Sequence, residues 1–165
     1  MQNTETRIRP EFLTILCVLT FIGSGIMILS GINNYREAEL ATALMREQMQ
    51  KSKAEVRTKN TSKEGAELAE SMINKALDVT NPQKTKQYSI ANIIGNAITL
   101  VGAMLMFSLR KNGFWVYLAG TLALVAAPIF IFGSGNFLSY GMSAVFGIIG
   151  LVFVILYSRN LKYMS

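Results

Sequence analysis

The sequence contains no histidine and only one cysteine, Cys17. An intramolecular disulfide is therefore excluded, and Cys/His zinc or haem sites lack their usual ligands. We interpret Cys17 as a small apolar residue inside a helix, and we expect neither a cofactor nor a metal site.

Charged residues are missing from three long stretches, which are residues 12–35, 87–109 and 112–158. About 20 apolar residues are enough for a helix to cross the ~30 Å hydrocarbon layer of a membrane. The first two stretches each fit one span, and the third is divided by the turn-forming letters "GSGN" at 133–136. Because backbone amides in lipid must be bonded within their own segment, we predict four helical spans, at 12–32, 88–109, 114–132 and 138–157.

The predicted fold class is all-α, a four-helix transmembrane bundle with an extramembrane helical hairpin inserted between the first and second spans. Residues 1–32 hold a tail and the first span, residues 33–87 the insert, and residues 88–165 the other spans and a short C-terminal tail. We expect one domain overall. The first apolar run is longer than that of a signal peptide, and no small-residue cleavage site follows it, so we expect an uncleaved span.

Positive charge favours one orientation in the membrane, because the cytoplasmic ends of spans are enriched in Lys and Arg. The connection between the third and fourth spans is uncharged, whereas the other short segments carry Arg7, Arg9, Arg110, Lys111, Arg159 and Lys162. We therefore predict that both termini are cytoplasmic and that residues 33–87 are periplasmic. The ten Lys/Arg of this insert count against the assignment, although long segments are translocated with less regard to charge.

Several aromatic residues lie near the ends of the predicted spans. Trp and Tyr are enriched where the lipid meets water, because their rings are apolar and their tips are polar. We therefore expect interfacial positions for Tyr35, Tyr88, Trp115, Tyr117, Tyr140 and Tyr157.

The insert is composed mainly of residues that favour helix. Residues 34–59 contain neither Gly nor Pro, so the first span is predicted to continue as one helix beyond the bilayer. Glu47–Lys51 and Glu55–Lys59 have the spacing of favourable ion pairs on such a helix.

A second helix is predicted at 62–78, after the letters "KNTS" interrupt the pattern. Thr61 and Glu64 have the spacing of a capping box at its start. Pro82 disfavours helix at Asn81, which ends it. The two helices can bury their apolar residues against each other, or can offer them to a partner protein or to lipid headgroups. These residues are Leu40, Leu44, Met45, Leu68, Met72, Ile73 and Leu77.

Two of these uses find little support in the residue pattern of the insert. The insert has no aromatic residue between Tyr35 and Tyr88, which counts against a lipid-surface role. Basic residues alternate with acidic ones and lack aromatic neighbours, so nucleic-acid binding is not expected.

The spans carry small and polar residues but no ionisable ones. Proton-coupled transport and membrane hydrolysis lack a titrating or basic group at depth, so we predict that the protein is not an enzyme. Small residues allow helices to approach closely, and buried amides bond across helices. The candidates for helix packing or for a polar site are Asn92, Gly95, Asn96, Thr99, Gly102, Ala119, Ala123, Ala127, Ser143, Gly147 and Gly150.

The letters "RPEFLTILCVLTFIGSG", residues 9–25, resemble the first span of small membrane proteins of Bacteroidota bacteria. The resemblance implies four spans in a bacterial inner membrane. It implies no activity and no functional residue.

Two functions remain open. The first is a non-catalytic accessory or scaffolding subunit of a larger inner-membrane complex, such as one for protein secretion or insertion, with membrane lipids and other membrane subunits as partners. The alternative is a transporter or channel for a small uncharged solute, with Asn92, Asn96 and Thr99 as its polar lining. A lipid-binding or envelope-stress factor is a third option.

Overall fold

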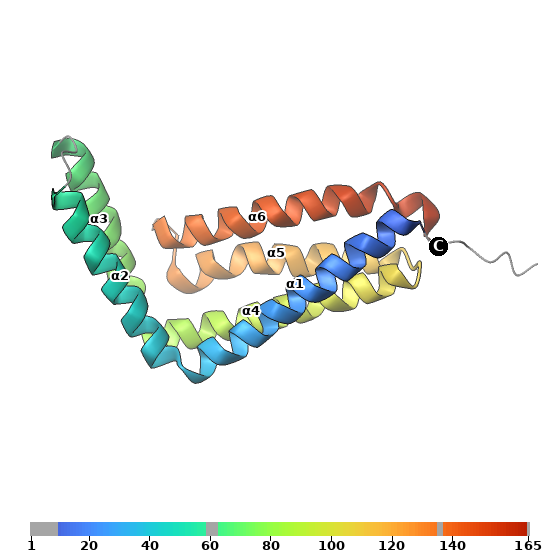
Figure 1. Cartoon of the computed structure of the whole chain (residues 1–165), viewed down its shortest axis with the longest axis horizontal. Helices are drawn as coiled ribbons and strands as arrows, with labels where there is room; N and C mark the ends of the chain where they lie inside the picture. Colours follow the sequence, from blue (N-terminus) through green and yellow to red (C-terminus); the bar gives the residue numbers. More distant parts are fainter. Residues whose placement is uncertain (1–9, 59–62, 135–136, 165) are drawn as a thin grey trace, which may run out of the picture.

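Helices form nearly all of the protein (Figure 1). The computed structural model describes residues 10–58, 63–134 and 137–164, and no strand occurs among them. The elements in chain order are α1 (Glu11–Arg36), α2 (Ala38–Thr58), α3 (Lys63–Val79), α4 (Pro82–Phe107), α5 (Asn112–Phe132), α6 (Phe137–Ser158) and the 3-10 turn η1 (Leu161–Tyr163). The all-α prediction is therefore confirmed.

Four of the helices are long and apolar enough to cross a membrane, which indicates a membrane protein. They are α1, α4, α5 and α6, and they coincide with the four predicted spans. All four extend beyond the predicted bounds, α5 and α6 by one or two residues and α1 and α4 by more, since α1 continues to Arg36 and α4 begins at Pro82. Asn81 is extended and caps α4, accepting a 2.9 Å hydrogen bond from the backbone N–H of Lys84. Proline is well suited to the first helical position because its missing N–H would have no partner there.

The closest helix pair is α4 with α5, and glycine makes this proximity possible. A Cβ atom added at Gly102 would lie 2.5 Å from the backbone N of Tyr117, and one at Gly120 would lie 2.8 Å from the backbone N of Thr99. A Cβ at Gly113 would lie 2.6 Å from the carbonyl oxygen of Gly102. The other main contacts join α1 to α4 and α6 to α5. The order in space is thus α1, α4, α5, α6.

Two tyrosines expected at the membrane interface belong instead to the buried core. Tyr117 and Tyr157 pack edge to face with ring centroids 5.0 Å apart, in a cluster with Leu13, Cys17 and Met106. Both side chains point inward because they lie on the contact faces of α5 and α6. The hydroxyl of Tyr157 also has a polar partner in the core, at 2.8 Å from Thr20 Oγ1. The prediction of interfacial positions for Tyr117 and Tyr157 is therefore wrong.

The first span does not continue as one straight helix, contrary to the prediction. The chain bends at Glu37, whose φ of −107° and ψ of 29° lie outside the helical range, and α2 leaves α1 at a sharp angle (Figure 1). Both helix-type hydrogen bonds of the Glu37 backbone are kept at the bend. Its N–H donates to Asn33 O, and its carbonyl accepts from the N–H of Ala41. The cause is tertiary, because Ala38 and Thr42 are buried and Thr42 Oγ1 lies 2.8 Å from Thr85 Oγ1 of α4.

The helix α4 ends two residues before the predicted end of its span. Leu109 has a left-handed φ of 59°, and its N–H bonds Met106 O while the N–H of Arg110 bonds Leu105 O. This pair of bonds is a Schellman motif, in which a left-handed residue closes the helix. Leucine costs more than glycine in this conformation, and its packing against the core cluster compensates.

The second helix of the insert is confirmed as α3. Glu47 and Lys51 form the predicted ion pair at 2.7 Å, although both side chains are exposed. Lys59 and Thr61 lie outside the described residues, and with them the second predicted ion pair and the capping box.

Candidate functional site

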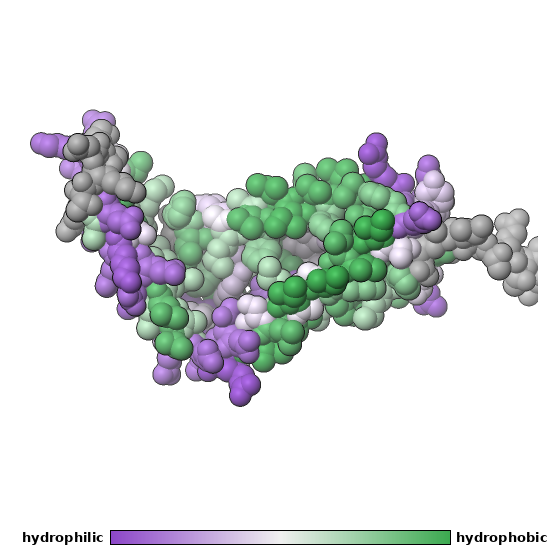
Figure 2. All heavy atoms as spheres, in the orientation of Figure 1, coloured by the Kyte–Doolittle hydropathy of each residue, from purple (hydrophilic) through white to green (hydrophobic). Residues whose placement is uncertain are grey.

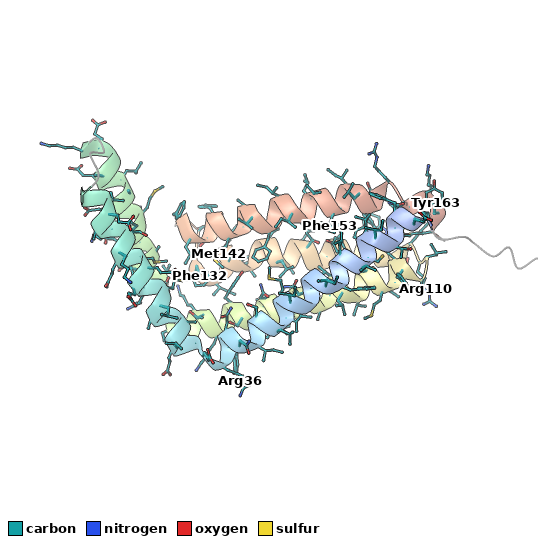
Figure 3. All side chains as sticks on the ribbon, viewed as in Figure 1. Arg36, Arg110, Phe132, Met142, Phe153 and Tyr163 are labelled. Carbon is teal, nitrogen blue, oxygen red and sulfur yellow. The ribbon has the colours of Figure 1, made fainter. Side chains whose placement is uncertain are left out.

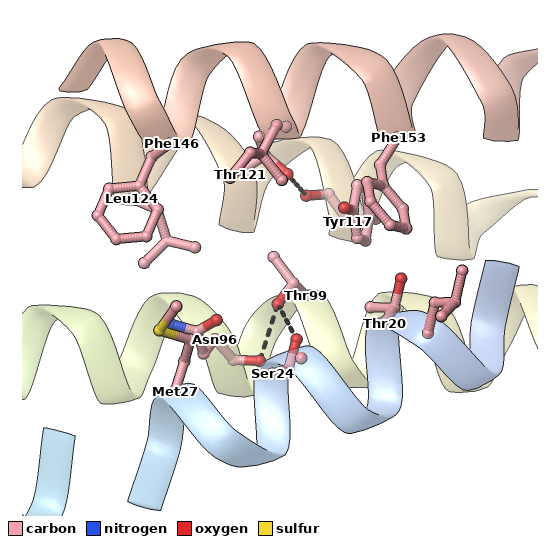
Figure 4. Close-up of a pocket in the computed structure, with 14 residues that line it drawn as sticks. Thr20, Ser24, Met27, Asn96, Thr99, Tyr117, Thr121, Leu124, Phe146 and Phe153 are labelled. Carbon is pink, nitrogen blue, oxygen red and sulfur yellow. Dashed lines mark hydrogen bonds between the residues drawn. The ribbon is translucent and has the colours of Figure 1, made fainter. Parts of the chain in front are cut away.

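A cavity of about 160 Å³ lies among the middle turns of α1, α4, α5 and α6 (Figure 4). Its polar lining consists of Thr20, Ser24, Asn96, Thr99, Tyr117 and Thr121. Its apolar lining includes Leu19, Met27, Leu124, Phe146, Ile149 and Phe153. Each lining residue lies outside the first and last turns of its helix, so the cavity is a pocket inside the length of the bundle.

Hydroxyl groups, rather than amides, join the helices around this pocket. Ser24 Oγ of α1 lies 3.0 Å from Thr99 Oγ1 of α4, and Thr20 Oγ1 of α1 lies 2.8 Å from Tyr157 OH of α6. Ser143 Oγ of α6 donates to the carbonyl of Val125 in α5 at 2.7 Å. Each bond crosses a helix interface in a buried setting, where a polar group without a partner is costly.

The two asparagines of α4 bond to each other instead of to a neighbouring helix. Asn96 Nδ2 donates to the backbone carbonyl of Asn92 at 2.9 Å and to Asn92 Oδ1 at 3.1 Å. Both side chains are buried, but only Asn96 lines the pocket. These two bonds of the Asn96 amide therefore fix its orientation on α4 and do not hold α4 to another helix.

The predicted packing residues fall into two groups. The first group is buried or half-buried. On α6, Ser143 and Gly150 are buried and Gly147 is half-buried. The candidates on α4 all lie on its buried face, and they are Asn92, Gly95, Asn96, Thr99 and Gly102. The α5 candidates lie elsewhere, since Ala119 and Ala123 are exposed and Ala127 is half-buried. Within the chain, α5 meets α4 through Gly113 and Gly120 instead.

Four polar residues of the pocket, Thr20, Ser24, Tyr117 and Thr121, were not among the predicted site residues, and neither were its apolar residues. The signal in α1 was the spacing of Thr20 and Ser24, which are four residues apart and share a face with Leu13 and Cys17. Tyr117 was expected at the membrane interface, and so it was not considered as a residue that points into the bundle.

A second candidate site is the exposed apolar surface of α2 and α3. Leu40, Leu44, Leu68 and Met72 are between 41% and 62% exposed. Met45, Ile73 and Leu77 are half-buried, and Ala76 is buried. The two helices therefore cover only part of their apolar side chains when they contact each other, and four large ones remain accessible.

Polar contacts attach α2 to the second half of α3 and to the residue that follows it. Arg46 Nε donates to Thr80 O at 2.9 Å and Arg46 Nη2 to Leu77 O at 3.2 Å, and Lys53 Nζ donates to Asn74 Oδ1 at 2.8 Å. The last carbonyls of a helix lack partners and carry partial negative charge, which a guanidinium satisfies. Arg46 thus caps the C-terminal end of α3.

We expect Arg46→Gln to raise the rate of amide hydrogen exchange in the last turn of α3 about fivefold, the equivalent of ~1 kcal/mol for charge-assisted bonds that are partly exposed. Hydrogen-exchange mass spectrometry of the detergent-solubilised protein measures this rate. Lys51→Gln is the control, because it removes only an exposed ion pair of little value. Equal exchange in the two variants would contradict the capping role.

The chemistry available to the pocket is that of uncharged hydrogen bonding and apolar contact. None of the residues that line it is an Asp, Glu, Lys or Arg, and in the described part of the chain no three His, Cys, Asp or Glu residues are grouped as metal ligands. The arrangement can therefore bind and orient a neutral molecule. Comparisons of the chain with protein-family models, with curated proteins and with solved structures give no match.

Proposed function

We propose that the protein is a non-catalytic accessory or scaffolding subunit of a larger complex in a bacterial inner membrane. In this proposal α1, α4, α5 and α6 form the membrane bundle, and α2 and α3 form an extramembrane helical hairpin that docks on another membrane subunit. The observation that carries it is the set of exposed apolar side chains on α2 and α3, Leu40, Leu44, Leu68 and Met72. Large apolar side chains exposed on helices outside the lipid are typical of protein–protein interfaces.

The attachment of the hairpin supports a docking role. Arg46 bonds the end of α3, and Thr42 lies at hydrogen-bond distance from Thr85 of α4, so α2 is tied to both helices that follow it. A docking element held in this way loses less conformational freedom when it binds a partner.

The charge distribution supports a periplasmic hairpin. Arg110 and Tyr163 lie at one end of the bundle, and Arg36 and Phe132 lie at the other (Figure 3). The end with Arg110 also carries Lys111, Arg159 and Lys162, as the cytoplasmic ends of spans do. The α2/α3 hairpin then lies on the periplasmic side.

The alternative, a channel or transporter for a small uncharged solute, is less well supported. Asn96 and Thr99 line the pocket, but Asn92 does not. The lining comes only from middle turns of the helices, which suits a binding pocket better than a path between the two sides.

The proposal is tested by co-purification of the full chain in a mild detergent. Leu40→Ser with Leu44→Ser is expected to reduce the co-purified partner about tenfold or more, because two half-exposed leucines would together lose ~1.4 kcal/mol or more of apolar burial. Glu39→Ser with Ala43→Ser is the matched control, since both residues are exposed on the same helix. A chain that purifies alone, or equal partner yields from the two variants, would remove the docking role.

A further inference from the structure

The pocket opens sideways, between α1 and α6. These helices are the two ends of the spatial order α1, α4, α5, α6 and make few contacts with each other. Figure 1 shows α1 crossing the bundle and approaching α6 only near the C-terminal end of the chain. In Figure 2, paler atoms are visible between the hydrophobic surfaces of α1 and α6. The opening therefore lies between two apolar helix surfaces. In a membrane such surfaces contact lipid tails, so the opening faces the lipid.

Glycine keeps this opening clear on the α1 side. Gly23 lines the pocket, and a Cβ atom added there would meet nothing within 4 Å. The neighbouring lining residues Leu19, Met27 and Ile149 are between 42% and 54% exposed. The mouth is thus apolar and accessible from outside the bundle.

Three of the hydroxyl protons on the polar side of the pocket, those of Ser24, Thr99 and Thr121, already have acceptors within the protein. Thr99 Oγ1 donates to Asn96 O at 2.9 Å, so Ser24 Oγ donates its own proton to Thr99 Oγ1. Thr121 Oγ1 donates to Tyr117 O at 3.0 Å. A hydroxyl group has one proton and two acceptor positions, so Ser24 and Thr121 offer the pocket acceptors.

The Asn96 amide adds the decisive acceptor. Its Nδ2 donates to two carbonyl oxygens of Asn92, and a backbone carbonyl accepts only, so the amide cannot be reversed. Its Oδ1 has no donor among the described residues, although the side chain is only 5% exposed and lines the pocket (Figure 4). A buried carbonyl without a donor is costly, and a ligand that supplies one is favoured.

We infer that this pocket binds the hydroxyl head of a neutral, membrane-soluble alcohol that enters from the lipid between α1 and α6. The hydroxyl donates to Asn96 Oδ1 and lies beside Ser24 and Thr121. Leu124, Phe146 and Phe153 contact the first carbons of the alcohol, and its remaining chain leaves past Gly23. The cavity volume of about 160 Å³ is close to that of an apolar protein cavity known to bind benzene, so it accepts a head of that size. A charged head is excluded, because the lining offers no counter-ion.

The test uses two photoactivatable probes, an octanol that carries a diazirine and the matched diazirine octane without the hydroxyl. The full chain is reconstituted in phosphatidylcholine nanodiscs, irradiated with each probe, and labelled residues are mapped by mass spectrometry. We expect the alcohol to label pocket residues such as Met27 and Phe153 about five- to tenfold more than the alkane, as one satisfied buried acceptor is worth ~1–1.4 kcal/mol.

Three variants separate the site from the surrounding lipid. Asn96→Leu should lower labelling by the alcohol to that by the alkane, and Gly23→Leu should abolish pocket labelling by both. Gly25→Leu is the control on the same helix, because Gly25 does not line the pocket and an added Cβ there also meets nothing within 4 Å. If Asn96→Leu does not fold, the comparison of pocket labelling in Gly23→Leu and Gly25→Leu still tests whether the probes enter this pocket. Equal wild-type labelling by the two probes, absence of pocket labelling, or unchanged labelling in Gly23→Leu would overturn the inference.

Discussion

Gly102→Ala is expected to destabilise the bundle by about 2–3 kcal/mol, the upper part of the range for overpacking a well-packed interior. The added Cβ would lie 2.5 Å from the N atom and 2.7 Å from the Cα atom of Tyr117. These are backbone atoms of α5, which cannot rotate aside as a side chain can, so α4 and α5 must separate. Because this is the most extensive helix contact of the chain, the separation loosens the core cluster around Tyr117 as well.

The matched control for Gly102→Ala is Gly25→Ala. An added Cβ at Gly25 meets nothing within 4 Å, and alanine is favoured over glycine inside a helix by about 0.5–1 kcal/mol. The control should therefore be neutral or slightly stabilising. Reversible unfolding in mixed detergent micelles, followed by circular dichroism, measures both. Equal stability of the two variants would show that α4 and α5 are not in close contact in the folded protein.

Cysteine labelling in intact cells is expected to give an all-or-none result for the orientation of the chain. Gln50 of α2 and Asn112 at the start of α5 are both exposed and uncharged, so replacing either with cysteine leaves the Lys/Arg distribution unchanged. With a periplasmic hairpin, Gln50→Cys reacts with a membrane-impermeant maleimide. Asn112→Cys reacts only after the inner membrane is permeabilised, because it follows the positively charged turn at Arg110 and Lys111.

The native sequence simplifies this measurement. Its single cysteine, Cys17, is fully buried among Leu13, Leu16 and Tyr157, so the unmodified chain serves as the unlabelled reference. Labelling of Asn112→Cys in intact cells, with Gln50→Cys protected, would reverse the proposed orientation. Labelling of both positions would contradict an odd number of membrane crossings between them.

The membrane helices were predictable because each is marked by a continuous run of uncharged residues in the sequence. A run of about 20 residues without charge is rare unless the run is placed in lipid, so composition alone locates α1, α4, α5 and α6. The end of the second insert helix was equally local, since Pro82 disfavours helix at the residue before it, and Asn81 is extended there. The start of α4 at Pro82, six residues before the predicted start of the span, was not predicted.

The contact faces of these helices were harder to predict. In a soluble helix the apolar stripe marks the buried side, but lipid is as apolar as a protein core, so a membrane helix is apolar on all sides. On α5 the sequence predicts a packing row at Ala119, Ala123 and Ala127, whereas the contact with α4 is made at Gly113 and Gly120. The glycines form the contact because the backbones of α4 and α5 come so close there that a Cβ atom on α5 would overlap α4.

The pocket and the bend at Glu37 depend on parts of the chain that meet only after folding. Ser24, Asn96 and Thr121 come from three helices far apart in sequence, so no local pattern joins them. The letters around Glu37 contain no proline or glycine, and the bend results from the packing of Ala38 and Thr42 against later helices.

The contact of α1 with α4 also has a consequence for biosynthesis. During synthesis, residues 37–81 are made after α1 and before α4. For this time α1 is in the bilayer without α4, the helix that it contacts most extensively. Its surface is apolar all round, which makes it stable in lipid on its own. The helices α4, α5 and α6 follow one another through short turns and can pair as soon as each is inserted. We therefore expect α1 to join last, docking onto a bundle that the later helices have already assembled.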